Sequence, residues 1–420
     1  MTSTLWRIAL GSLWSRRFTV VLTLVTIAVS VALLLGVERL RQDARQSFLR
    51  TVSGIDLVVG ARAHPVQLML YSVFRLGEAT NNISWNAYQA VANQPGVGWT
   101  VPISLGDSHR GYRVVGTTAG YFDHVRYAGD QPLVMAQGKR FDGLFDAVVG
   151  AAVARDLGYA PGERIVLAHG TSTANPNLHD DRPFTVSGVL APTGTPIDHA
   201  IYVSLEAIEA IHMNWRAGTR IGTAPDPDTI DPARLQPRTI TAFYVGLERR
   251  MAVFAVQRWV NEYRAEPMTA VLPGVALQQL WGLLGTAERA LTITAACVVL
   301  TGLLGLLAVL LATLEERRRE MAILRAVGAS PRHVAGLLLW EAALLAVLGT
   351  AVGYVLLQGA AAALAPWLQA QYGLLLSVGL PGANEWRLMG LVVASALAVS
   401  CVPALLAYRH SVADGITVKH

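Results

Sequence analysis

The chain has 420 residues, of which 53% are hydrophobic and only 15% are charged. This composition excludes an ordinary soluble domain and indicates a membrane protein. The formal charge of +5 comes almost wholly from arginine, since Lys139 and Lys419 are the only lysines. In a membrane protein such a balance is typical of basic flanks next to the lipid bilayer, so we expect no nucleic-acid partner.

The N-terminal region predicts a helix that lies at the membrane and then a helix that crosses it. Residues 1–17 mix apolar residues, two tryptophans and arginines at helical spacing, which favours an interfacial helix over a frayed terminus. Residues 18–37 are free of charge and long enough for one span, and too long for a signal peptide. Ala28, Ala32 and Gly36 repeat every four residues, which would leave a strip for close helix packing.

Residues 38–289 differ from the rest in being mixed in composition and punctuated by proline and glycine, which predicts a large extracytoplasmic α+β domain. We expect two lobes, with the block 140–215 made mainly of strands. Helical stalks are expected at both membrane ends, over residues 38–50 and 275–287. Strands are expected at 99–105, 112–117, 164–168, 184–190, 200–203 and 240–247, and helices at 84–93 and 252–263.

Three further apolar runs predict three more spans, so the expected fold is four transmembrane helices with the α+β domain inserted between the first and second. The expected segments are a second span at 290–314, a cytoplasmic helix and turn at 315–333, a third span at 334–359, a short periplasmic loop at 360–387, a fourth span at 388–408 and a tail at 409–420.

The segment 315–333 carries a dense block of charge between two spans. Glu315 and Arg319 stand four residues apart with the acid first, which supports a helix. Gly328 fits the position just past a helix end, and Ser330 followed by Pro331 fits the start of the next helix. A short charged helix between two spans is a surface that a soluble partner could push on.

The same segment resembles a known family. The pattern Arg-x-x-Glu-x-Ala-x-Leu-Arg-Ala-x-Gly-Ala-Ser, from Arg317 to Ser330, with a glutamate at 341, is similar to the signature of ABC-transporter permeases of the MacB, LolC/LolE and FtsX type. The resemblance implies that an ATPase docks on this segment and that two permease chains pair, as a homodimer or with a related chain. The residues implied in ATPase coupling are Glu315, Glu316, Arg319, Glu320, Leu324, Arg325, Gly328, Ala329, Ser330 and Pro331.

The placement of arginine predicts the topology. Basic residues gather in the N-terminus, in the segment 315–333 and in the tail, whereas the loop at 360–387 has none before Arg387. Because basic residues collect on the cytoplasmic side, we expect both termini to be cytoplasmic and the large domain to face outward from the bacterial inner membrane.

Glu341 is the most unusual residue within a predicted span. It lies ten residues past Pro331, roughly 15 Å along a helix, and a carboxylate at that depth normally faces other helices or a partner. The alternatives are a contact within the bundle and a solvated acid near the interface, and the resemblance favours the first. Gly349 and Gly353 form a GxxxG pattern on the same span, compatible with close packing.

No motif for catalysis is found. With two lysines, neither in G-x-x-x-x-G-K-[ST], the chain has no phosphate-binding loop, so ATP and Mg²⁺ are expected on a partner subunit and no cofactor on this chain. No hydrolase motif occurs either. Seven histidines fall in the large domain without close ligand spacing, so structural or solvated roles are favoured over a metal site, with His179, Asp181 and His199 as weak candidates.

The predicted function is therefore a permease that couples ATP hydrolysis by a separate subunit to motion of its periplasmic domain, for export or extraction of a substrate. The alternative is an FtsX-like regulator that transmits the same motion to a periplasmic partner without transport. Lipoprotein release, as in LolC/LolE-type members, is a third. A periplasmic adaptor or substrate-binding partner fits each of them, and no residue names the substrate.

Overall fold

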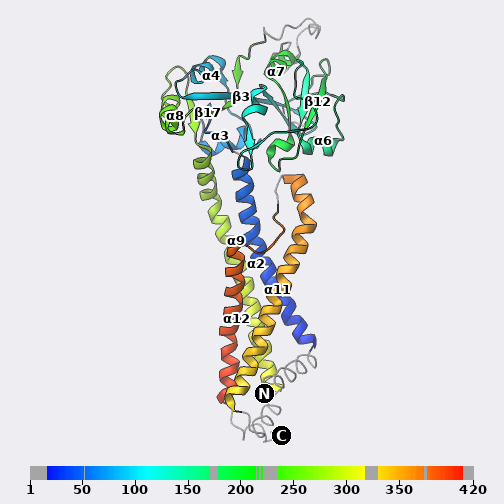
Figure 1. The fold of residues 1–420 in the computed structure, drawn as a ribbon, viewed down its shortest axis with the longest axis vertical. Helices are drawn as coiled ribbons and strands as arrows, with labels where there is room; N and C mark the ends of the chain where they lie inside the picture. Colours follow the sequence, from blue (N-terminus) through cyan, green and yellow to red (C-terminus); the bar gives the residue numbers. More distant parts are fainter. Residues whose placement is uncertain are drawn as a thin grey trace. The chain divides into compact units, whose positions relative to one another are not determined.

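The computed structural model describes residues 17–51, 53–170, 177–213, 215–216, 219–220, 235–316, 330–372 and 376–409. The chain divides into two compact units. We call residues 1–43, 285–366 and 376–420 the helical unit, and residues 44–284 and 367–375 the αβ unit. Figure 1 shows the helices and strands of each.

Four long helices contain the apolar runs. They are α2 (Arg17–Thr51), α9 (Pro273–Glu316), α11 (Pro331–Tyr372) and α12 (Ala383–Arg409). Each has a stretch long and apolar enough to cross a membrane, at Arg17–Gln46, Gly285–Ala312, Pro331–Leu368 and Ala383–Arg409. With the large mixed domain between the first and second, these helices confirm the predicted fold class.

The helical unit has its own apolar core. Ile27 and Leu35 of α2, Leu306 of α9, Leu345 of α11 and Val392 of α12 are buried together in it. Large apolar side chains on other faces of the same helices are exposed, as expected for surfaces that contact lipid tails rather than water. Examples are Leu22, Val29, Leu300, Leu304, Leu356, Leu391 and Leu405.

A sheet of twelve strands organises the αβ unit, and its main path runs β18-β1-β17-β3-β4-β13-β8-β12-β7. The strands of this path are β1 (Leu57–Ala61), β3 (Val97–His109), β4 (Tyr112–Thr117), β7 (Met135–Gly138), β8 (Asp146–Val149), β12 (Phe184–Leu190), β13 (Ala200–Ser204), β17 (Ala242–Leu247) and β18 (Met268–Val271). Off the path lie β9 (Arg164–Ile165), β10 (Ala168–His169) and β11 (Asn177–Leu178).

β3 joins the two halves of this sheet. Its first part pairs with β17, as in Val101 with Tyr244, and its second part pairs with β4, as in Leu105 with Val115. Between the pair Leu105–Val115 and the next pair, Ser108–Arg113, the register of β3 with β4 shifts, which marks a β-bulge. The sheet is thus continuous through the unit, and a division into two lobes stays a prediction.

Short helices pack on the sheet (Figure 1) and bury its faces. They are α3 (Pro65–Ser72), α4 (Trp85–Ala92), α5 (Gly120–His124), α6 (Ala151–Leu157), α7 (Leu205–His212) and α8 (Val253–Asn261), with 3-10 turns at Pro196–His199 and Arg250–Ala252. Two-residue strands complete the unit: β2 (Ile83–Ser84), β5 (Arg126–Tyr127), β6 (Gln131–Pro132), β14 (Trp215–Arg216), β15 (Thr219–Arg220) and β16 (Thr239–Ile240).

The predicted strands at 112–117 and 184–190 are present with the same bounds, whereas the one at 164–168 is two short strands, β9 and β10.

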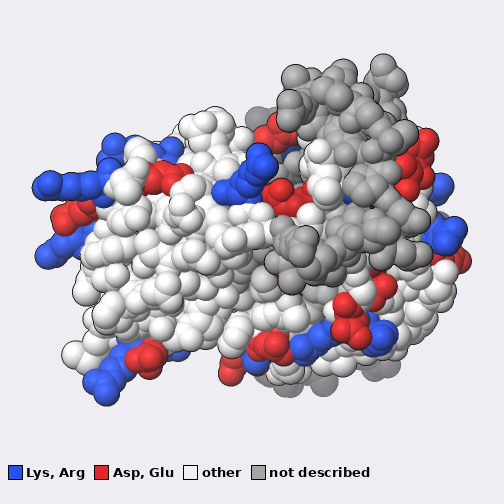
Figure 2. Space-filling model, turned by 90° about the horizontal axis from the view of Figure 1, so that it is seen from above, with Lys and Arg blue, Asp and Glu red and all other residues white. Residues whose placement is uncertain are grey.

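On the face shown in Figure 2, the described Lys, Arg, Asp and Glu side chains lie mostly around the edge, with both signs interspersed and a broad uncharged area between them.

Candidate functional site

The predicted ATPase-coupling residues fall largely outside the described residues. Glu315 and Glu316 close α9, while Arg319, Glu320, Leu324, Arg325, Gly328 and Ala329 all lie in the range 317–329, outside the described part of the chain. Ser330 and Pro331 open α11, where the Ser330 hydroxyl lies 2.7 Å from His333 Nδ1. Proline at a first helical position costs no hydrogen bond, which explains why α11 begins there.

Glu341 is buried, with 8% of its surface exposed, within the apolar stretch of α11. A carboxylate in that environment normally faces other helices or a partner rather than bulk water or lipid. Of the two interpretations that the sequence allows, this burial supports a contact within the bundle.

The small residues of α2 and α11 lie against each other. A Cβ added at Gly353 would lie 2.5 Å from the Ala28 carbonyl oxygen, and one at Gly349 would lie 2.7 Å from Ile27 Cγ2. Ala32 packs at the edge of the same core, and a Cβ at Gly36 would meet Leu357 Cδ1 at 3.4 Å. The backbones of α2 and α11 therefore approach so closely that no side chain fits at Gly353.

A buried ion pair joins α2 to α12. Arg39 Nε donates to Glu385 Oε1 and Arg39 Nη2 to Glu385 Oε2, both at 2.8 Å, and the side chains are 7% and 6% exposed. Glu385 Oε2 also accepts from the Gly382 amide at 3.0 Å, and the Arg39 guanidinium lies 5.7 Å from the centre of the Tyr354 ring. The two-point geometry satisfies both charges, which a buried pair needs in order to persist.

One helical turn further along α2, Asp43 holds the chain segment that leads into α12. Its carboxylate accepts from the Ser377 amide and the Ser377 hydroxyl, both at 2.9 Å, and Arg39 Nη1 donates to the Ser377 carbonyl at 3.3 Å. None of these residues was predicted from the sequence as a contact. The signal that could have found them is opposite charge just beyond the ends of two apolar runs, in Arg39 and Glu385.

In the αβ unit, four titratable side chains from separate parts of the fold converge. Asp107 of β3 faces His169 of β10, its cross-strand partner, while His179 follows β11 and His212 ends α7. Asp107 Oδ1 lies 3.4 Å from His169 Nδ1, 3.4 Å from His212 Nε2 and 3.9 Å from His179 Nε2. His169 Nδ1 is 3.0 Å from His212 Nε2. We call these four residues the histidine cluster.

The environment sets the protonation of the histidine cluster. Burial raises the pKa of Asp107, but the contacts with His169 and His212 outweigh burial and lower that pKa to about 2. Burial lowers the pKa of His179 to about 4, against the opposing effect of the Asp107 charge. The pKa of His212 is raised, because its contacts with Asp107 outweigh burial. At neutral pH the cluster therefore contains an ionised carboxylate and a neutral His179.

The histidine cluster includes only one of the three weak metal candidates, His179. Asp181 and His199 lie outside it; the ring of His199 is stacked on Tyr112 instead, with ring centres 6.5 Å apart. Asp107, His169 and His212 were not singled out, since they are spread over more than a hundred residues and only the fold brings them together.

Comparison with known proteins decides the family. The family model described as a MacB-like periplasmic core domain matches residues 20–240, more than half of the chain, and the FtsX-like permease C-terminal model matches residues 292–412. This chain belongs to the MacB-like permease family. The resemblance drawn from the sequence is confirmed, and both matches together with the four apolar helices make the permease a protein of the bacterial inner membrane.

Curated relatives of the permease are distant. It is 24% identical over 374 residues to the pyoverdine export ATP-binding/permease protein PvdT of Pseudomonas savastanoi pv. phaseolicola (strain 1448A / Race 6), covering 86% of this chain and 51% of the relative. For PvdT of Pseudomonas fluorescens (strain Pf0-1) the values are 23% over 373 residues, 84% and 51%. The permease thus spans about half the length of these relatives.

Several solved structures also match, among them the following two. The periplasmic region of MacB from Actinobacillus actinomycetemcomitans has a TM-score of 0.33 and 12% identity, covering 56% of this chain and 98% of that region. The extracellular domain of the ABC-type transporter YknZ from Gram-positive bacteria has a TM-score of 0.30 and 13% identity, covering 52% and 98%.

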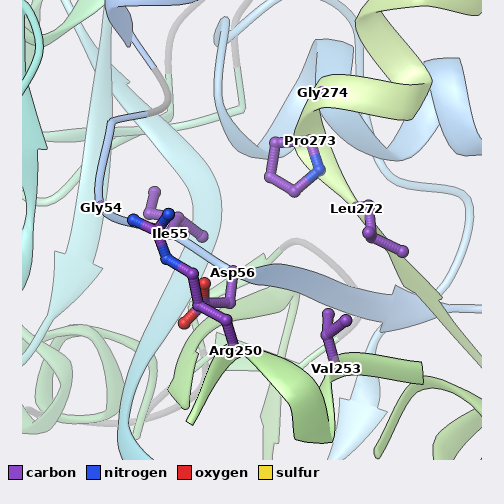
Figure 3. A pocket seen from close by; sticks show the side chains of 8 residues that line it. All are labelled: Gly54, Ile55, Asp56, Arg250, Val253, Leu272, Pro273 and Gly274. Atoms are coloured by element: carbon purple, nitrogen blue, oxygen red, sulfur yellow. The ribbon is translucent and has the colours of Figure 1, made fainter. Parts of the chain in front are cut away.

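The αβ unit of the permease also has a small open pocket of about 340 Å³ (Figure 3). It lies where the chain enters β1 and where it passes from β18 into α9. The residues that line it are Gly54, Ile55, Asp56, Arg250, Val253, Leu272, Pro273 and Gly274. Asp56 Oδ2 accepts from the Leu247 amide at 2.8 Å, so this carboxylate fastens the start of β1 to the end of β17.

Proposed function

We propose that this chain is the permease part of an ABC transporter, in which ATP hydrolysis by an ATPase subunit drives motion of the αβ unit and export of a substrate. The observation that carries the proposal is the pair of family matches, which covers residues 20–240, with the first span and most of the αβ unit, and residues 292–412, with the last three spans. Two such chains pair in the working transporter.

The ATPase subunit binds ATP and Mg²⁺ and docks on the segment 315–331 from the cytoplasm. The support is the charge pattern: arginines gather in this segment and in both termini, and basic residues collect on the cytoplasmic side of membrane proteins. The αβ unit is then periplasmic.

The continuity of two helices supports transmission of motion. α2 extends to Thr51, well past the charge-free run that ends at Val37, and α9 begins at Pro273, well ahead of the charge-free run that starts at Ala290. Residues of both units lie on each of these unbroken helices. A helix without a break transmits displacement along its axis because its backbone hydrogen bonds resist extension.

The relatives support the export direction. The PvdT proteins are named for pyoverdine export and for combining ATP-binding and permease parts. We propose the same coupling of ATP binding to export for this chain.

The experiment is copurification of the full chain from native membranes in mild detergent, followed by an ATPase assay. The test variant reverses two charges, Glu320→Arg with Arg325→Glu. The control exchanges an exposed ion pair of the αβ unit, Lys139→Glu with Asp142→Lys, whose charged atoms lie 3.6 Å apart. Both variants keep the net charge, so a difference between them reports the position of the charges.

We expect an ATPase to copurify with the native chain and the control and to be lost from the test variant. If no ATPase accompanies any of the three, or if all three retain it equally, the proposed docking is wrong. An ATPase that docks as expected while the reconstituted complex activates a periplasmic hydrolase and moves no substrate would identify the regulator instead.

A further inference from the structure

The histidine cluster has the composition and placement of a built ligand set. Asp107 and His179 are 2% and 0% exposed, while His169 and His212 are 43% and 26% exposed. Two ligands are therefore fixed in the protein interior, and two lie at the surface, where an ion can enter. The four side chains come from three separate parts of the fold: β3, the β10–β11 hairpin and the end of α7.

The spacing of the atoms fits one ion. Four ligand atoms at tetrahedral angles, each about 2.0–2.1 Å from Zn²⁺, lie roughly 3.3 Å from one another. The measured separations are 3.0 Å for His169 Nδ1 to His212 Nε2, and 3.4, 3.4 and 3.9 Å from Asp107 Oδ1 to His169, His212 and His179. All four atoms lie within 4.8 Å of one another. Small rotations of the side chains complete the tetrahedron.

The imidazole rings are oriented to converge, not to stack. The planes of His169 and His212 meet at 75°, and His179 meets each of the other two at 86°. Edge-to-face rings are also common in aromatic packing, so the crossed planes allow the ring nitrogens to aim at a common point, and the distances between those nitrogens carry the argument.

A backbone contact fixes the tautomer of one ligand. His212 Nδ1 lies 2.8 Å from the Ile208 carbonyl oxygen. A carbonyl can only accept, so Nδ1 carries the hydrogen and, in the neutral ring, Nε2 presents its lone pair to the cluster. Metal-binding histidines typically donate their second ring nitrogen to a carbonyl or carboxylate in this way.

The donor set selects the kind of ion. Three imidazole nitrogens and one carboxylate oxygen, without sulfur, suit Zn²⁺, with Co²⁺ and Ni²⁺ as close competitors. The all-oxygen ligands that Mg²⁺ and Ca²⁺ prefer are absent from this set of four.

We propose that Asp107, His169, His179 and His212 bind one Zn²⁺ ion in the αβ unit. The bound ion links β3, the β10–β11 hairpin and α7, and it exchanges with solvent through the side on which His169 and His212 are exposed. This proposal stands apart from the transport function, since it concerns the αβ unit of a single chain.

The test measures Zn²⁺ binding to the full chain, purified in detergent with a tag free of histidine and stripped with a chelator. Competition against a chromophoric zinc chelator gives the stoichiometry and Kd. We expect one ion per chain for the native protein, and a loss of affinity on the order of 100-fold or more for His169→Ala, His212→Ala and Asp107→Asn, because direct ligands matter at least as much as their outer-shell partners. His199→Phe is the matched control and should bind as the native chain does.

Two further readouts separate ligation from folding. Co²⁺ bound at this site should give the intense visible absorption of four-coordinate cobalt, which Asp107→Asn abolishes while the far-ultraviolet circular dichroism stays unchanged. Zn²⁺ should also raise the thermal denaturation midpoint of the native chain, because a ligand that binds only the folded state stabilises it.

Two results would overturn the proposal. One is a native chain that binds no Zn²⁺ at micromolar concentrations, which would make the cluster a hydrogen-bonded network without an ion. The other is equal binding by the native chain and by His169→Ala and His212→Ala, which would place the ion elsewhere. Both results leave the ATPase copurification unaffected, so failure of this proposal differs from failure of the proposed function.

Discussion

Two buried carboxylates, Glu385 in the helical unit and Asp107 in the αβ unit, are satisfied in different ways. Glu385 meets one guanidinium through two hydrogen bonds of 2.8 Å and accepts a third from the Gly382 amide. Asp107 Oδ1 instead faces three imidazole nitrogens at 3.4–3.9 Å. The protein itself supplies the hydrogen-bond partners of Glu385, whereas the longer distances around Asp107 leave space between the carboxylate oxygen and the imidazole nitrogens.

This difference separates a structural ion pair from a candidate binding site. The charge of Glu385 is matched by Arg39, which is always protonated, so the pair needs nothing further. The imidazoles around Asp107 can be neutral, and three lone pairs beside a carboxylate attract a cation or a proton.

The largest effect is expected from breaking the pair on one side. Arg39→Met leaves Glu385 buried without its cation, which costs about 3–5 kcal/mol of stability. The double variant Arg39→Met with Glu385→Leu removes both charges and should recover most of that loss. Thermal and chemical denaturation of the helical unit in detergent measures both. A double variant as unstable as the single one would contradict the interpretation of a charge-matched pair.

Arg41 of α2 and Glu288 of α9 provide the matched control. Their charged atoms lie 3.9 Å apart and the side chains are 42% and 28% exposed. A partly exposed pair of this kind contributes about 0–1 kcal/mol, so Glu288→Gln should change the denaturation midpoint little.

The second effect concerns how closely α2 and α11 pack at Gly353. Gly353→Ala should destabilise the helical unit by about 1–3 kcal/mol, because the new methyl group has backbone and side-chain atoms of α2 within 2.5–3.2 Å. Gly359→Ala, on the same helix and with nothing within 4 Å of the added Cβ, is the control and should be neutral or stabilising. Equal denaturation midpoints for the two variants would contradict the close approach.

The sequence predicted what depends on local pattern. Four apolar runs gave four membrane helices, and alternating apolar segments gave strands such as β4 and β12, because hydrophobic burial acts directly on the residues that carry it. The motif from Arg317 to Ser330, followed by Glu341, indicated the correct family because its residues are close together in the chain.

What the sequence missed depends on pairing between distant residues. His169 meets Asp107 only through the register of β10 with β3, and His212 arrives at the end of a separate helix. The side-by-side pattern of His179 and Asp181 suggested a site, but the carboxylate that joins His179 in the cluster belongs to Asp107. Arg39 and Glu385 are 346 residues apart, so their pairing needs the helix bundle to exist first.

A smaller effect is expected at the second carboxylate of α2. Ser377→Ala removes the hydroxyl that donates to Asp43, while the backbone amide of residue 377 still donates to the same carboxylate. The loss of one such hydrogen bond should cost about 0.5–1.5 kcal/mol. Denaturation of Ser377→Ala and of Arg39→Met under the same conditions measures the difference between their losses of stability. A loss as large as that of Arg39→Met would mean that Asp43, not the ion pair, holds this end of the bundle.

The smallest effect is expected in the αβ unit at His199, which lies outside the histidine cluster. Burial lowers the pKa of His199 below its ordinary 6.5, against the opposing charges of Asp198 and Asp156, and Arg155 lowers it further. The unfolded chain therefore takes up a proton at His199 before the folded chain does, so folding stability falls as the pH drops from 6.5 through the folded-state pKa and is unaffected above 6.5.

His199→Phe keeps a ring against Tyr112 and removes this titration. The denaturation midpoint of the αβ unit in this variant should match the native chain at about pH 8 and exceed it at about pH 5, by the stability that the native His199 loses on protonation in the unfolded state. His199 Nε2 is buried without a hydrogen-bond partner among the described residues, so the substitution leaves no acceptor unsatisfied. Parallel pH profiles for the two proteins would show that His199 stays solvated, and that burial of imidazole in this unit is confined to other histidines.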